Sequence, residues 1–166
     1  MNRLSLVGPS AATVVLGVPL AILDRRMRAA GGPGIIPFEL ARPDRSDEIL
    51  RAWGDGGQRA ARTSLLLDFP YLVAYTTLHV RLTDRAGEGL TADGDGVLRA
   101  MAPVVKGVQV AAGLCDAVEN AALLGVVRRG GDAKLASVAR TAALAKFAGL
   151  IVGWVYDGTA LLRRRR

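Results

Sequence analysis

The feature that most constrains this chain is a run of twenty residues without a charge, residues 4–23. As a helix this run is about 30 Å long, which matches the hydrocarbon core of a bilayer. Three further windows of spanning length, residues 63–80, 104–127 and 138–160, contain no more than three Asp, Glu, Lys or Arg residues each. We therefore expect one all-α integral membrane domain over residues 1–166, a four-helix transmembrane bundle with spans at about these windows.

A soluble helical bundle is the alternative, because Ala and Gly are only weakly apolar. A soluble bundle helix shows a polar face at every turn or so. The segments VAYTTLHV and FAGLIVGWVY lack such a face, and apolar residues make up 51% of the chain. The membrane interpretation is therefore favoured. Heavy use of Ala, Arg and Gly is typical of a bacterium with GC-rich DNA, so we expect a multi-pass protein of the bacterial inner (plasma) membrane.

Charge and cysteine content exclude several functions. The single Cys excludes an internal disulfide and a Cys-based zinc site, and the single His argues against a multi-histidine metal centre. We therefore expect no metal and no cofactor. Much of the +7 net charge flanks the apolar windows, as membrane anchoring requires. The expected partner is the lipid bilayer rather than nucleic acid.

The connection between the first two windows contains a predicted short helix, residues 43–54. Pro43 and acidic residues crowd its first turn and Gly54 stands at its end, as helix termini prefer. Ile49, Leu50 and Trp53 fall on one face. This pattern predicts an interfacial helix with Trp53 at the level of the lipid headgroups.

Ionisable residues inside the windows point to a binding site. A charge at bilayer depth costs about 2.5–3.5 kcal/mol, so each should face a partner between the helices. Helical spacing aligns polar residues within each window, and counting residues from one side places them at similar depth. The connection before the second window could cover them. The candidate binding cluster is Glu39, Asp68, Tyr71, Tyr75, Asp116, Glu119, Asn120 and Lys146.

Three functions fit this cluster. Three buried acids near one Lys cannot all stay charged, so we expect at least one to hold a proton near neutral pH. The cluster could belong to a transport or ion- or proton-coupling module or a membrane-complex subunit, with a small molecule, ion or lipid as ligand and a homo-oligomer or membrane partner. It could instead be a purely structural polar network. A membrane enzyme acting on a lipid-like substrate is disfavoured, because no Ser stands beside a base and His79 lies about 16 Å from Asp68 by helical rise. We assign no catalytic residue.

Four short motifs carry a resemblance. They are Phe38-Glu39-Leu40-Ala41, Leu67-Asp68-Phe69 with Tyr75, Asp116-x-x-Glu119-Asn120, and Lys146 in the last window. Together they resemble a family of small bacterial integral membrane proteins with four predicted spans, uncharacterised in activity. The resemblance covers about residues 4–160. It implies a membrane location and a helix count, and it implies no reaction.

Overall fold

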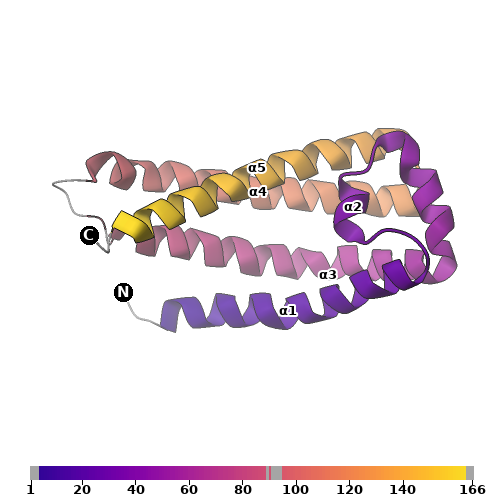
Figure 1. Ribbon diagram of the computed structural model, residues 1–166, viewed down its shortest axis with the longest axis horizontal. Helices are drawn as coiled ribbons and strands as arrows, with labels where there is room; N and C mark the ends of the chain where they lie inside the picture. The colour runs from indigo at the N-terminus through magenta and orange to yellow at the C-terminus, as the bar shows by residue number, and fades with distance from the viewer. Residues whose placement is uncertain (1–3, 89, 91–94, 164–166) are drawn as a thin grey trace.

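The computed structural model describes residues 4–88, 90 and 95–163, and these residues are helical almost throughout. In chain order the elements are α1 (Leu4–Ala29), α2 (Ile35–Glu39), a 3-10 helix η1 (Pro43–Arg45), α3 (Ser46–Glu88), α4 (Gly96–Arg129) and α5 (Ala133–Arg163). No strand occurs in the described part of the chain. The all-α expectation is confirmed. The four long helices lie side by side, with α1 packed against α3 (Figure 1).

The expectation of a four-span bundle is wrong. Among the described residues, three helical segments are long and apolar enough to cross a membrane: residues 6–29, α4 and α5. The window at residues 63–80 lies in α3, which does not meet the same standard. Asp68, His79 and four Ser or Thr side chains interrupt its apolar run. Neutral polar groups also resist transfer out of water, so scarcity of charge alone overestimated the number of spans.

The outer surfaces of α1, α4 and α5 are rich in exposed apolar side chains. Val15 on α1 is 68% exposed, and Leu114 on α4 and Val155 on α5 are exposed to a similar degree. A soluble protein rarely exposes apolar surface along several whole helices. The three helices therefore indicate a membrane-embedded protein.

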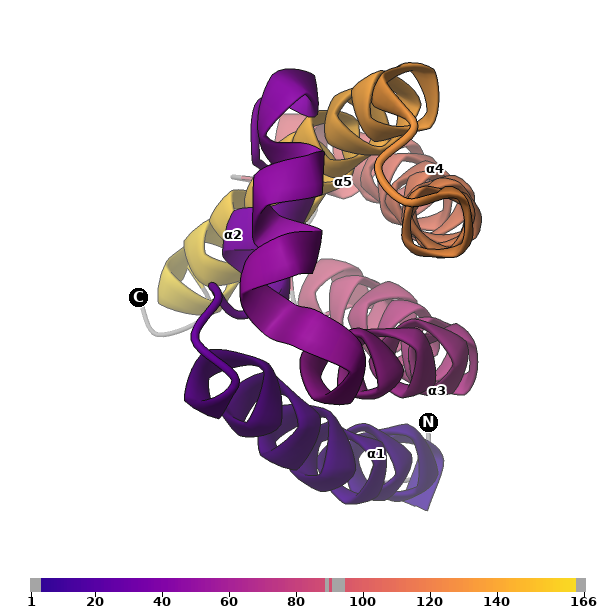
Figure 2. The same cartoon turned by 90° about the vertical axis from the view of Figure 1, so that its right-hand side faces the viewer.

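The predicted interfacial helix is also corrected. Residues 46–53 form the first part of α3, and the chain bends at Gly54, where φ is +54°. The helix therefore ends where the sequence predicted, but the chain enters the rest of α3 directly. This first part of α3 crosses one end of the long helices, together with α2 (Figure 2).

Trp53 is buried in protein rather than placed at the headgroups. Its side chain is 2% exposed, its indole Nε1 donates a hydrogen bond to the Pro33 carbonyl at 2.8 Å, and its ring meets that of Phe38 edge-on at 4.7 Å. Ile49 and Leu50 share the same core. The apolar face of this segment packs on α2 and on the ends of the long helices, so its side chains are buried in protein rather than in lipid.

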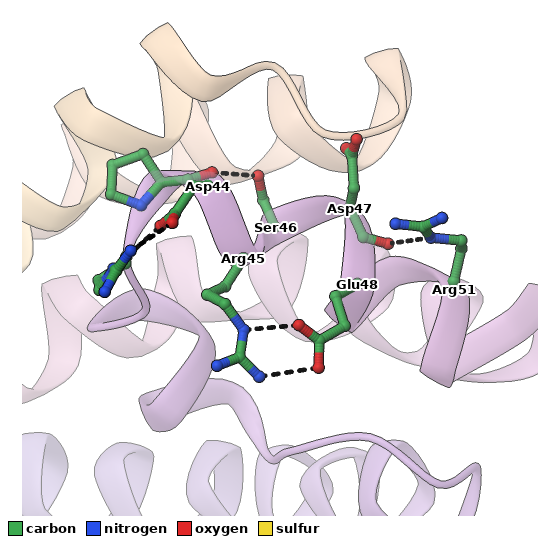
Figure 3. Close-up of polar contacts among 8 residues, drawn as sticks. Asp44, Arg45, Ser46, Asp47, Glu48 and Arg51 are labelled. Atoms are coloured by element: carbon green, nitrogen blue, oxygen red, sulfur yellow. Dashed lines mark hydrogen bonds and ion pairs between the residues drawn. The ribbon is translucent and has the colours of Figure 1, made fainter.

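Polar contacts surround the start of α3 (Figure 3). The Ser46 hydroxyl donates to the Pro43 carbonyl at 2.7 Å, and Arg45 pairs with Glu48 at 2.6 Å. Both members of that ion pair are more than half exposed, and exposed pairs contribute at most about 1 kcal/mol. The buried apolar residues beneath therefore hold this end in place, and with it α2, which carries Glu39.

Candidate functional site

The centre of the site is the ammonium group of Lys146 on α5, which contacts three carboxylates. Its Nζ lies 2.7 Å from Glu119 Oε2, 3.0 Å from Asp116 Oδ1 and 3.2 Å from Glu39 Oε2. Glu119 and Asp116 come from α4, and Glu39 comes from α2, 107 residues earlier in the chain than Lys146. All four side chains are less than a tenth exposed. The expected buried acid and lysine cluster is confirmed.

Helix α3 extends this network through two further hydrogen bonds. The Tyr75 hydroxyl donates to Asp116 Oδ2 at 2.6 Å, and Asn120 Nδ2 donates to Asp68 Oδ2 at 2.7 Å. We refer to Glu39, Asp68, Tyr75, Asp116, Glu119, Asn120 and Lys146 as the acid–lysine cluster. Tyr71, the eighth predicted residue, packs beside Tyr75 with ring centroids 5.5 Å apart. The structure thus brings all eight residues together, and their role in binding stays a prediction.

Local spacing explains why α4 and α5 present these groups to each other. Asp116, Glu119 and Asn120 are three and four residues apart and share one helical face. On α5, Gly149 continues the face of Lys146. A Cβ atom at Gly149 would lie 2.9 Å from the Ala112 Cβ on α4, closer than side chains tolerate. The small residue therefore allows the close approach of the two helices that buries the cluster.

The cluster carries more acid than base. Its four carboxyl groups, those of Glu39, Asp68, Asp116 and Glu119, are accompanied by a single ammonium group, which contacts three of them. Glu119 is fully buried, and its Oε1 has no hydrogen-bond partner among the described residues. Its Oε2 contacts Lys146 at ion-pair distance but without the geometry of a hydrogen bond. Buried charges without full compensation are costly, so the cluster is expected to take up protons or a cation.

A cavity of about 460 Å³ lies beside the cluster. Seven of the eight predicted residues line it, Glu119 being the exception, so the polar groups form part of a wall that a ligand could reach. Side chains from α1, α3 and α5 complete the wall and are largely apolar or aromatic. These include Leu20, Leu78, His79, Phe147, Leu150 and Trp154.

Several lining residues were missed in the sequence. Asp24 on α1 accepts a hydrogen bond from the Ile35 backbone N–H at 2.7 Å and another from Arg28 Nε at 2.8 Å. It thereby ties the end of α1 to the start of α2. In the sequence, Asp24 could have been recognised as the first charged residue after the charge-free run. His79 also lines the cavity. Its separation from Asp68 along the helix therefore does not exclude it from the site, because the cavity extends along α3 between the two residues.

A second polar network lies further along α3. Thr83 bridges Gln109 on α4 and Asp157 on α5, with Thr83 Oγ1 2.9 Å from Asp157 Oδ1 and Gln109 Nε2 2.9 Å from Thr83 Oγ1. Lys106 pairs with Asp84 nearby at 2.6 Å. In contrast to the acid–lysine cluster, this ion pair matches one acid with one base. It therefore provides a balanced reference within the same protein.

The arrangement of acids does not indicate a metal centre. Within residues 4–88, 90 and 95–163, no group of three or more His, Cys, Asp or Glu side chains is placed to hold a metal ion.

In comparisons with known proteins, no family model, no curated protein and no solved structure matches this chain. The resemblance to small bacterial membrane proteins therefore stays a prediction, and the function is argued from the site alone.

Proposed function

We propose that this protein is a membrane-embedded coupling module, in which the acid–lysine cluster exchanges protons as a ligand enters and leaves the cavity. The observation that carries this proposal is the imbalance of four carboxyl groups against one ammonium group, with three of those carboxyl groups and the ammonium group in the wall of a cavity. A cluster that must hold extra positive charge to be stable can exchange that charge for a ligand. This exchange is the basic requirement of proton-coupled transport.

The contacts of Lys146 suggest how the exchange is transmitted. Its ammonium group is shared among carboxylates from α2 and α4, and Asp116 is also bound by Tyr75 of α3. Protonation of one carboxyl group weakens its attraction for Lys146 and leaves the ammonium closer to the others. The flexible four-carbon side chain of lysine permits such a shift. A proton taken up at the cavity wall would therefore change the contacts between four helices, α2, α3, α4 and α5.

The two competing hypotheses account less well for the site. A purely structural network would be expected to lie away from any cavity, whereas seven of the predicted residues line one. A hydrolytic or transfer enzyme would require an activated nucleophile. Ser64 lines the cavity, and Cys115 is adjacent to Asp116 in the sequence. Among the described residues, neither side chain donates a hydrogen bond to a cluster carboxylate.

Infrared spectroscopy of the protein in lipid nanodiscs tests the proposal directly. A protonated carboxyl group gives a C=O stretching band that a carboxylate lacks. We expect wild-type protein to show such a band at neutral pH and to lose it reversibly as the pH is raised. Glu119→Gln and Asp68→Asn should each reduce or shift the band, because each removes one of the four competing carboxyl groups.

The matched control is Asp84→Asn, which removes an acid that already has its own lysine. This variant should leave the band unchanged. A wild-type band that does not respond to pH would support a closed structural network and contradict the proposal. The absence of any band that depends on Glu119 or Asp68 would contradict it as well.

A further inference from the structure

We infer that the cavity beside the acid–lysine cluster binds an organic cation with an apolar or aromatic body, and that Asp68 is the main counter-ion. The inference rests on the proposed function in using the same cavity, and it adds the chemical class of the ligand. It follows from three features of the cavity wall: its charge, its rings and its apolar surface.

The charge of the wall favours a cation over an anion. Lys146, the only basic residue of the cluster, is already within 3.2 Å of three carboxylates. Asp68 also lines the cavity, where it accepts a hydrogen bond from Asn120, and no ion pair to it occurs within the described residues. Asp68 can therefore accept a cation at a lower cost than Lys146 can accept an anion, since Lys146 would first have to leave its own partners.

Arg28, the second Lys or Arg residue among the described residues of the wall, does not change this balance. Arg28 lines the cavity at its α1 side, where its Nε binds Asp24 at 2.8 Å. Its side chain is 61% exposed. A solvated guanidinium that already has a carboxylate partner attracts an anion weakly. The negative groups around Asp68 are by contrast buried or half-buried.

A series of rings leads along the cavity from Asp68 toward Trp154. Tyr71 and Tyr75 are 5.5 Å apart, Tyr75 and His79 are 6.1 Å apart, and His79 and Trp154 are 6.3 Å apart, measured between ring centroids. All four residues line the cavity. Aromatic faces attract organic cations, and they also pack well against an apolar body. Trp154 is 59% exposed, so the series runs from the cluster to the outer surface of α5.

The size and polarity of the cavity fit a compact ligand. A volume of about 460 Å³ lies within the range of roughly 300–1,000 Å³ that is usual for small-molecule sites. Leu20, Leu78 and Leu150 supply apolar contacts on α1, α3 and α5. A cation bound at Asp68 and a proton would compensate the same excess of negative charge. Binding of the cation should therefore release a proton.

Two ions of equal shape and opposite charge test this inference. Tetraphenylphosphonium and tetraphenylborate are each equilibrated with the protein in lipid nanodiscs, and binding to empty nanodiscs is subtracted. We expect saturable binding of one tetraphenylphosphonium per chain and no saturable binding of tetraphenylborate. Asp68→Asn should weaken tetraphenylphosphonium binding at least about tenfold, because the counter-ion is lost. The control Asp84→Asn should bind as the wild type does.

A second pair of variants tests the rings independently of Asp68. Tyr71→Leu should weaken tetraphenylphosphonium binding about two- to fivefold. Tyr71→Phe should bind tetraphenylphosphonium as the wild type does, because the ring rather than the hydroxyl attracts the cation. Equal or tighter binding of tetraphenylborate would overturn the inference. Unchanged affinity in both Asp68→Asn and Tyr71→Leu would overturn it too.

Proton release, followed with a pH indicator in weak buffer, separates the two proposals. Saturable cation binding without proton release would support the ligand class and contradict proton coupling. A pH-dependent carboxyl band without cation binding would support the coupling proposal and contradict the ligand class.

Discussion

Replacement of Lys146 by Met removes the only positive charge of the acid–lysine cluster while keeping most of the side-chain volume. In the wild type the Lys146 ammonium lies within 3.2 Å of three carboxylates that are each less than a tenth exposed. Loss of one partner of a buried ion pair costs about 3–5 kcal/mol, because the remaining charge stays buried without compensation. We expect Lys146→Met to lose about this much free energy of unfolding at neutral pH.

The loss of unfolding free energy in Lys146→Met should depend on pH. Without Lys146, the carboxyl groups of the folded variant are stable only when protonated, so the folded state binds more protons than the unfolded state. Stability therefore rises as the pH falls. The deficit of Lys146→Met relative to the wild type should shrink at acidic pH. Equilibrium unfolding in detergent micelles with increasing dodecyl sulfate, followed by circular dichroism at several pH values, measures this difference.

Lys106→Met is the matched control. Lys106 pairs with Asp84 at 2.6 Å, but these side chains are 34% and 36% exposed, and water competes for their charges. We expect a loss of no more than about 1 kcal/mol. An equal loss in both variants would refute the reasoning. So would a deficit in Lys146→Met that stays the same at acidic pH.

Two further predictions concern packing and capping. Gly153→Ala should destabilise the protein by about 1–3 kcal/mol in the same unfolding assay, because its Cβ would lie 2.5 Å from Gln109 Nε2 and 3.2 Å from Gln109 Cδ and Cγ. Gln109 is buried and its Nε2 donates a hydrogen bond to Thr83, so its side chain cannot move aside without losing that bond. Gly158→Ala on the same helix meets nothing within 4 Å and should not destabilise, and equal losses would contradict the close-packing argument. Asp132 accepts hydrogen bonds from the Leu135 and Lys134 backbone N–H groups, and the bond from Leu135 is the main cause that holds the pKa of Asp132 below its ordinary value. Its stabilising effect is therefore present above that ordinary value and lost as the pH falls through the lower folded-state pKa. Thermal unfolding should show Asp132→Ala less stable than wild type at neutral pH, with the two converging in acid, and a difference that persists in acid would contradict this origin.

Features that depend on helical spacing could be predicted from the sequence. Asp116, Glu119 and Asn120 must share one face of any helix that contains them, whatever packs against it. Lys146 and Gly149 follow the same rule, and Gly149 lies where α5 closely approaches α4. Long charge-free or nearly charge-free runs likewise predicted membrane helices at α1, α4 and α5. Periodicity and hydropathy are local properties, so both can be obtained from the sequence without knowledge of the fold.

Features that depend on long-range packing could not be predicted in the same way. Residues 46–53 have an amphipathic pattern that fits a membrane interface and a protein core equally well, and only the position of α2 shows that Trp53 lies in a core. The number of spans was overestimated for a different reason, because a count of charges in residues 63–80 ignores the uncharged polar side chains there.

The sequence by itself determined that this chain is all-helical and membrane-embedded and that acids and one lysine occur deep within its helices. The tertiary structure decided that Glu39 reaches Lys146 from 107 residues away and that Asp24 joins α1 to α2. It also decided that a cavity opens beside the cluster. The physical reason is that spacing along one helix sets which residues share a face. Only the approach of separate helices sets which faces meet, which charges are shared and what space remains between them.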